Sequence, residues 1–189
     1  MTQEFYIKNM VCDRCIKILR NELEGEGLSV QEVELGRVIL RIKNRKPNII
    51  SLLKVLQSNG FILISSENQK LVEAVKIELI ILLRNLPLEQ EGKLSEFLAQ
   101  RFQTDYSKIS KIFSSTEKVT VEKYFIKLKI EKVKELIQDG QYNFTEIGQS
   151  LNYNNVNYLS RQFKAETGMS LTQYKSLKKF KRNSLDQIV

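Results

Sequence analysis

The stretch FTEIGQSLNYNNVNYLSRQFKAETG, residues 144–168, decides the fold of the C-terminal half of this chain. Apolar residues recur in it at helical spacing: Phe144, Ile147, Leu151, Leu159 and Phe163. The Asn-rich segment 152–155 interrupts this spacing with a turn signal, and Gly168 is typical of the end of a helix. The stretch therefore predicts two short helices joined by a tight turn, a helix-turn-helix unit.

The same pattern occurs a second time, closer to the middle of the chain. Helical spacing of apolar residues indicates two more short helices and then a long one, at 94–102, 109–113 and 121–137. We therefore expect an all-α domain with two helix-turn-helix units over residues 94–178 and a fraying basic tail over 179–189. Each unit can place its second helix in a major groove of double-stranded DNA. A helical bundle that binds protein is the alternative.

The first 66 residues change their hydrophobic period several times. Alternating residues indicate strands and a period near 3.6 indicates helices, in the order strand 4–9, helix 13–24, strands 28–35 and 38–42, helix 47–60 and strand 61–65. This β-α-β-β-α-β order is typical of a ferredoxin-like sandwich. The expected fold class is thus an α+β domain over residues 1–66 followed by the all-α domain.

Residues 67–93 are expected to connect the two domains. Residues 68–86 have the spacing of a helix that is apolar on most of its circumference, and PLEQEG at 87–92 is typical of a domain boundary. A helix of this kind needs partners on several sides. Packing between the domains of one chain and a homodimer interface through 68–86 are equally good interpretations.

The chain is basic, and most of its excess charge lies in the second half. Of 189 residues, 30 are Lys or Arg and 22 are Asp or Glu, which gives a net charge of +8. Residues 94–189 hold 16 of the cations and 10 of the acids. Such an excess suits a nucleic acid or another anionic partner.

Other functions are disfavoured by composition. The chain has no histidine, which removes histidine-dependent catalytic triads and Cys/His zinc fingers. It shows no nucleophile–base pair, phosphate-binding Gly-rich loop or carboxylate cluster, so we do not expect an enzyme. No signal peptide or membrane span is visible, and its two cysteines build no disulfide framework, so we expect a cytoplasmic protein.

Residues 90–178 resemble the DNA-binding domain of AraC/XylS transcription regulators. The resemblance rests on residues 144–153, on YLSRQFK at 158–164, and on Gly168 and Tyr174, with a looser match in the first unit. Four positions depart from the family pattern, which commonly has Gly, Gly, Pro and Arg where this chain has Asn152, Lys118, Leu171 and Lys129. Asn tolerates the left-handed turn conformation, so we expect the turn at Asn152 to form.

The resemblance also implies which side chains meet DNA. The base-reading positions of the family correspond to Ser107, Ser110, Lys111, Asn157, Tyr158 and Arg161. Arg161 or Lys111 can donate to guanine, and Asn157 can pair with adenine. We expect Lys108 and Lys164 to contact phosphate, which positions the protein without reading sequence.

NMVCDRC, residues 9–15, follows the first expected strand. With the β-α-β-β-α-β pattern it resembles the heavy-metal-associated domain of copper chaperones and metal-transporting ATPases, over about residues 1–66. The resemblance implies that Cys12 and Cys15 bind Cu(I), or Zn(II) if other ligands join, with Met10 packed beneath the loop. The helix N-terminus and Arg14 are expected to favour thiolates. A fold that persists without metal and a redox pair are the alternatives.

Two functions follow from these observations. The first is a transcription regulator of the AraC type, whose affinity for DNA a soft metal at Cys12 and Cys15 would change through the connecting helix. The second is a cytosolic metallochaperone or metal-buffering protein whose basic domain docks on an acidic partner. Strong preference for one duplex sequence separates the first from the second.

Overall fold

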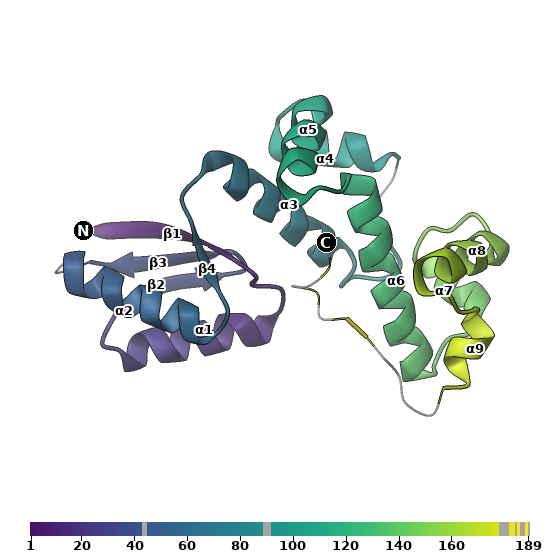
Figure 1. Ribbon diagram of the computed structural model, residues 1–189, viewed down its shortest axis with the longest axis horizontal. Coiled ribbons are helices and arrows are strands. Elements are labelled where there is room, and N and C mark those ends of the chain that lie inside the picture. The colour runs from purple at the N-terminus through teal and green to yellow at the C-terminus, as the bar shows by residue number, and fades with distance from the viewer. Residues whose placement is uncertain (43–44, 89–91, 178–181, 184, 186–187, 189) are drawn as a thin grey trace. The chain divides into compact units, whose positions relative to one another are not determined.

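The computed structural model describes all residues except 43–44, 89–91, 178–181, 184, 186–187 and 189. Part of the expected linker and part of the expected basic tail therefore lie outside the described residues. The contacts divide the chain into two compact units, Met1–Ile77 and Glu78–Val189. Each unit is drawn in Figure 1.

The first unit has the element order expected from its sequence. Its elements are β1 (Thr2–Lys8), α1 (Asp13–Gly25), β2 (Ser29–Glu34), β3 (Arg37–Arg41), α2 (Arg45–Ser58) and β4 (Ile62–Ile64). The strands form one antiparallel sheet in the order β2-β3-β1-β4. In the central pair Phe5 lies opposite Val38.

The core of this unit lies on one face of the sheet, between the sheet and the pair of helices α1 and α2 (Figure 1). Alternate strand residues point to it because side chains of a strand alternate between faces. Its fully buried members include Ile7, Val38, Leu40, Leu19, Leu23 and Leu52. Met10 is also fully buried, as a member of the same core.

Helix α3 (Glu67–Leu82) begins in the first unit and ends in the second. In its first half, Lys70 Nζ lies 4.5 Å from the centre of the Tyr6 ring, and the Asn9 N–H donates to Glu73 Oε1 at 3.0 Å. Tyr6 alternates with Phe5 and Ile7, so this half of α3 packs on the sheet face opposite α1 and α2.

The contacts divide the chain inside α3, between Ile77 and Glu78, whereas a domain boundary at 87–92 stays a prediction. The helix also ends at Leu82, four residues before the expected position 86. Leu79 and Ile80 are buried in the second unit, and the Leu88 N–H donates to Ser150 O at 2.8 Å. Most apolar side chains of α3 are therefore already buried or half-buried within one chain. A homodimer interface through this helix stays a prediction.

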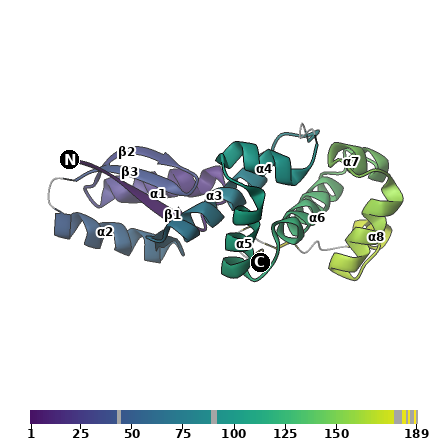
Figure 2. The same ribbon diagram turned by 90° about the horizontal axis from the view of Figure 1, so that it is seen from above.

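The second unit is helical. Its further elements are α4 (Leu94–Phe102), α5 (Tyr106–Glu117), α6 (Val121–Asp139), α7 (Phe144–Ser150), α8 (Val156–Thr167) and α9 (Leu171–Lys175). Five of them match the expected helices, and α9 is an addition. The long helix α6 contacts α5 on one side and α7 and α8 on the other, as Figure 2 shows.

The second unit contains an internal repeat in which a residue and the residue numbered 50 higher have the same environment. Helix α5 runs from 106 to 117 and α8 from 156 to 167. The buried pair Ile109 and Phe113 corresponds to Leu159 and Phe163. Ring centroids are 5.5 Å apart between Phe113 and Tyr124, and again between Phe163 and Tyr174. The two helix-turn-helix units are therefore built on one local plan.

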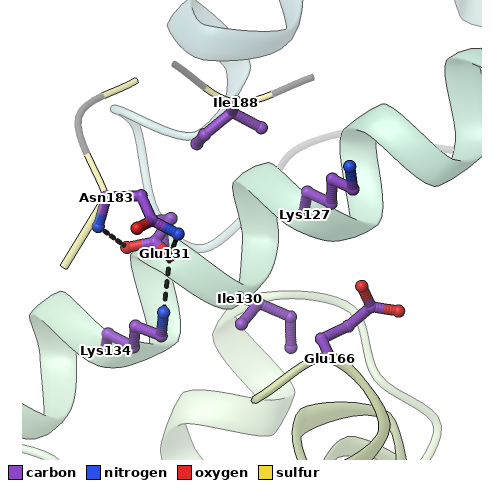
Figure 3. A pocket seen from close by; sticks show the side chains of 7 residues that line it. All are labelled: Lys127, Ile130, Glu131, Lys134, Glu166, Asn183 and Ile188. Carbon is purple, nitrogen blue, oxygen red and sulfur yellow. Dashed lines mark hydrogen bonds and ion pairs between the residues drawn. The ribbon is translucent and has the colours of Figure 1, made fainter. Parts of the chain in front are cut away.

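The described part of the tail contacts α6, and the expectation that it frays stays a prediction. Arg182 pairs with Glu135 at 2.8 Å. Both the backbone N–H and the side-chain amide of Asn183 donate to Glu131, and Figure 3 shows these two residues side by side. Lys134 Nζ donates to the same carboxylate at 2.6 Å. Ile188 is buried beside them, at a small cavity of about 150 Å³. The ammonium group of Lys134 and the two amide donors of Asn183 explain how Glu131 can be buried in α6.

Among the described residues, no helix is both long and apolar enough to cross a bilayer.

Candidate nucleic-acid interface

Helix α5 presents one polar face to solvent because its opposite face is anchored in the core. Ile109 and Phe113 are buried, one turn apart. The same helical period leaves Ser107, Lys108 and Lys111 exposed, whereas Ser110 is half-buried. The structure thus brings three of the four expected α5 residues together on the outer face.

Helix α8 repeats this arrangement with different side chains. Its N-cap residue Asn155 accepts the Tyr158 N–H at 2.9 Å, which fixes where the helix begins. All four residues expected to meet DNA are exposed: Asn157, Tyr158, Arg161 and Lys164. In the repeat, Asn157 and Arg161 occupy the positions of Ser107 and Lys111. The two helices therefore offer equivalent faces with different hydrogen-bonding groups.

The outer faces of α5 and α8 are positively charged. Each helix contains a single carboxylate, and both are withdrawn from the outer face, since Glu117 is buried and Glu166 is paired with Lys123 at 2.5 Å. Among the described residues, no carboxylate forms an ion pair with the four exposed cations: Lys108, Lys111, Arg161 and Lys164. A face with cations and no exposed acid attracts phosphate.

A connection that the sequence analysis did not identify supports the second unit. Lys129 Nζ of α6 donates to Leu151 O at 3.0 Å and lies 4.0 Å from the centre of the Tyr153 ring. The Tyr153 hydroxyl donates to Gln162 Oε1 at 2.6 Å, on α8. Burial lowers the pKa of Lys129 to about 8. Lys129 therefore attaches α6 to the turn before α8. In the sequence, the only signal of this contact was that a Lys stands where the AraC/XylS pattern commonly has an Arg.

Aromatic contacts continue from this connection to the outer face. The rings of Tyr153 and Tyr158 are 6.0 Å apart, and the Arg161 guanidinium lies 5.9 Å from the Tyr158 ring centre. Tyr158 is 48% exposed, so its ring covers Arg161 without being part of the core. Arg161 thus has a neighbour that limits its orientation before DNA arrives.

The two cysteines lie together at the start of α1. Their Sγ atoms are 3.4 Å apart and both residues are half-buried. Burial raises the pKa of the Cys15 thiol and so opposes the effect expected of Arg14 and the helix N-terminus, which stays a prediction. Within the described residues, no group of three or more Cys, Asp or Glu side chains could hold a metal ion. Two soft sulfur ligands fit Cu(I), but not the four-ligand site that Zn(II) prefers.

Comparisons with known proteins agree with the helical unit. Residues 98–176 match a family model described as a helix-turn-helix domain. The chain is similar to a solved structure of the C-terminal domain of AraT, a response regulator from Geobacillus stearothermophilus. The TM-score is 0.52 at 18% identity, over 63% of this chain and 94% of that one.

Two further solved structures are similar at lower scores. One is a DNA-binding transcriptional dual regulator from Escherichia coli K-12, with TM-score 0.46 and 17% identity over 59% of this chain and 92% of that one. The other is the transcriptional regulator CdpR from Pseudomonas aeruginosa, with TM-score 0.45 and 10% identity over 76% of this chain and 46% of that one. No curated protein matches the chain by sequence.

The comparisons thus identify a helix-turn-helix domain over residues 98–176, a motif that DNA-binding proteins use to enter the major groove. The helix-turn-helix domain expected in the C-terminal half is confirmed over these residues.

Proposed function

We propose that this protein binds a specific DNA sequence and reads two major-groove segments with α5 and α8. The observation that carries the proposal is the repeat that gives the two helices the same buried pair and three equivalent exposed positions, 107/157, 108/158 and 111/161. A protein that uses both helices must support each in the same way, because docking in a groove requires a rigid helix.

The exposed side chains differ in which groups of DNA they can bind. Lys111 and Arg161 can each donate to guanine O6 and N7, and Asn157 can pair with adenine. Lys108 and Lys164 carry charge without a planar recognition group and fit phosphate. Ser107 and Ser110 offer small hydroxyl groups, and Tyr158 restrains Arg161 or contacts a base.

For the first unit we infer a ferredoxin-like sandwich that senses a signal or mediates association. Its strand order β2-β3-β1-β4 with both helices on one face supports this inference. Control by Cu(I) or Zn(II) through Cys12 and Cys15 is not part of the proposal. Only two ligands are in place among the described residues, which is too few for Zn(II) and enough for Cu(I), so control by Cu(I) stays a prediction. A metallochaperone is also disfavoured, because that function does not explain why the two helix-turn-helix units share one local plan.

Selection of genomic DNA fragments by the purified full-length protein tests the proposal. We expect enrichment of fragments that share two short conserved blocks, and binding to the enriched duplex that is at least roughly 1000-fold tighter than to a scrambled duplex at the same salt concentration. Affinity for both duplexes should fall as salt rises. Equal binding to the enriched and scrambled duplexes would contradict sequence-specific reading.

The use of both helices is tested separately. Changing base pairs in either conserved block should weaken binding, and Lys111→Ala and Arg161→Ala should each remove discrimination in a different block. If both substitutions affected the same block, or if a single block sufficed for full affinity, only one helix would read DNA.

A further inference from the structure

The cysteine pair has a geometry close to that of a dithiol about to close. Cys12 is the N-cap residue of α1, and the Cys15 N–H donates to Cys12 O at 2.9 Å, so a tight turn holds both side chains on one side. The Sγ atoms are 3.4 Å apart. A disulfide bond needs about 2.05 Å, so the sulfurs must approach by only roughly 1.4 Å. Both residues are half-buried and within reach of a small reagent.

The loop that carries the pair is tied to α3. Asn9 precedes Cys12 by three residues and has a φ of 77°, a left-handed conformation that Asn tolerates. Its N–H donates to Glu73 Oε1 at 3.0 Å, and its side-chain amide donates to Gly60 O at 3.0 Å. Since α3 continues into the second unit, the Asn9–Glu73 contact connects the cysteine loop to the helix that both units share.

We propose that Cys12 and Cys15 form a reversible intramolecular disulfide, and that its closure changes the affinity of the protein for DNA through the Asn9–Glu73 contact. The second part rests on the proposed function. The first part is a property of the first unit alone and can be measured without DNA.

The oxidant we assign is a low-molecular-weight disulfide such as oxidised glutathione. The Cys12 thiolate attacks one of its sulfur atoms, the old S–S bond breaks, and one glutathione leaves with the bonding electron pair and takes up a proton. Cys15, deprotonated in turn, attacks Cys12 Sγ in the mixed disulfide and releases the second glutathione. Two protein thiols are oxidised and one small disulfide is reduced to two thiols. Cys15 packs against the hydrophobic core of the first unit, whereas Cys12 precedes the helix as its N-cap residue, so Cys12 is the first to attack.

The chemical test uses the full-length protein, treated with a chelator and incubated in glutathione buffers of increasing oxidised fraction. We expect loss of both reactive thiols in one transition, a product lighter by two hydrogen atoms, and full reversal by dithiothreitol. Cys15→Ser should instead retain one glutathione on Cys12. A wild-type protein that stays reduced, or that accumulates glutathione adducts on both cysteines, would overturn the proposal.

The transmission test compares reduced and oxidised protein on the selected duplex. We expect affinities that differ at least about fivefold in the wild type, in the range typical of coupled sites. With Cys12→Ser, the same treatments should leave affinities within about twofold of each other. Equal affinities of the two wild-type forms would refute transmission. Absence of specific binding by either form would instead refute the proposed function, and the thiol measurement would then still decide whether the disulfide forms.

The route is tested on the Asn9 amide, independently of DNA. Its hydrogen-exchange rate should differ at least about fivefold between oxidised and reduced protein, because disulfide closure is expected to change its hydrogen bond to Glu73. Glu73→Leu, if it folds, should still form the disulfide but lose the difference in affinity. An unchanged exchange rate at Asn9 would rule out this contact as the route.

Discussion

The ammonium group of Lys129 lies 4.0 Å from the centre of the Tyr153 ring, under the turn that joins α7 to α8. It also donates to Leu151 O, which would otherwise lack a helical partner near the end of α7. The long helix therefore holds the second helix-turn-helix unit by a buried cation. Burial lowers the pKa of this cation from 10.5 to about 8.

This burial makes stability depend on pH. Between about pH 8 and 10.5 the unfolded chain binds a proton at Lys129 that the folded protein has lost, so the free energy of unfolding should rise with pH in this window, by at most about 1.4 kcal/mol per pH unit. Lys129→Met should lack this rise. Urea unfolding at pH 7.5, 8.5 and 9.5 measures it, with Lys17→Met on the exposed face of α1 as the control. Equal slopes for wild type and Lys129→Met would show that Lys129 is not buried as a cation.

Arg161→Ala should weaken binding to the selected duplex by about 1–3 kcal/mol and relax preference at one base pair. Lys164→Ala should instead weaken binding to all duplexes alike and reduce the salt dependence by about one counterion. Titrations at several salt concentrations separate the two effects. Lys17→Ala removes an exposed charge from the first unit and should change neither quantity. A uniform loss with Arg161→Ala would assign that side chain to the backbone.

The repeat makes a prediction about helix ends. Lys118 ends α5 with a φ of 62°, and Gly168 ends α8 with a φ of 75°. A side chain at such a φ is strained, so Gly168→Ala should lower the free energy of unfolding by about 1 kcal/mol, and Lys118→Gly should raise it by up to that amount. A Cβ at Gly168 meets nothing within 4 Å, so a steric clash should not add to the change in the free energy of unfolding. Urea unfolding of both variants measures these changes, and shifts of the same sign would contradict the argument.

Phe163→Ala should lower the free energy of unfolding by about 3–5 kcal/mol, because the ring is fully buried and packs on Tyr174 with centroids 5.5 Å apart. Tyr158→Ala is the matched control on the same helix. Its ring is 48% exposed, so stability should change by less than about 0.5 kcal/mol while affinity for the selected duplex falls. Comparable losses of stability in both variants, measured by urea unfolding, would place Tyr158 in the core.

Much of the candidate site could be predicted because its signals are local. The spacing of Leu159 and Phe163 identifies the buried side of α8, and the exposed side follows from the helical period. The same reasoning identifies α5 from Ile109 and Phe113. The helical period does not indicate which polar side chains become buried, nor which partners they contact there. Lys129 and Glu131 look like surface residues in the sequence, yet the first is largely buried beside Tyr153 and the second is buried beneath Asn183.

Long-range contacts explain the other differences. The apolar circumference of α3 indicates a buried helix, but not that the division between the two units falls inside it, between the buried residues Val75 and Leu79. The tail lacks a strong hydrophobic period, and its attachment depends on partners 47 and 52 residues away in α6.

The order of strands and helices and the outer faces of α5 and α8 could be determined from the sequence alone. Hydrophobic period, turn residues and charge were enough for this, because each acts over a few neighbouring positions. Only the tertiary structure decided that α3 belongs to both units, that Lys129 supports the turn before α8, and that Asn9 ties the cysteine loop to Glu73. Each of these is a contact between residues far apart in the chain, whose free energy depends on burial that no local pattern encodes.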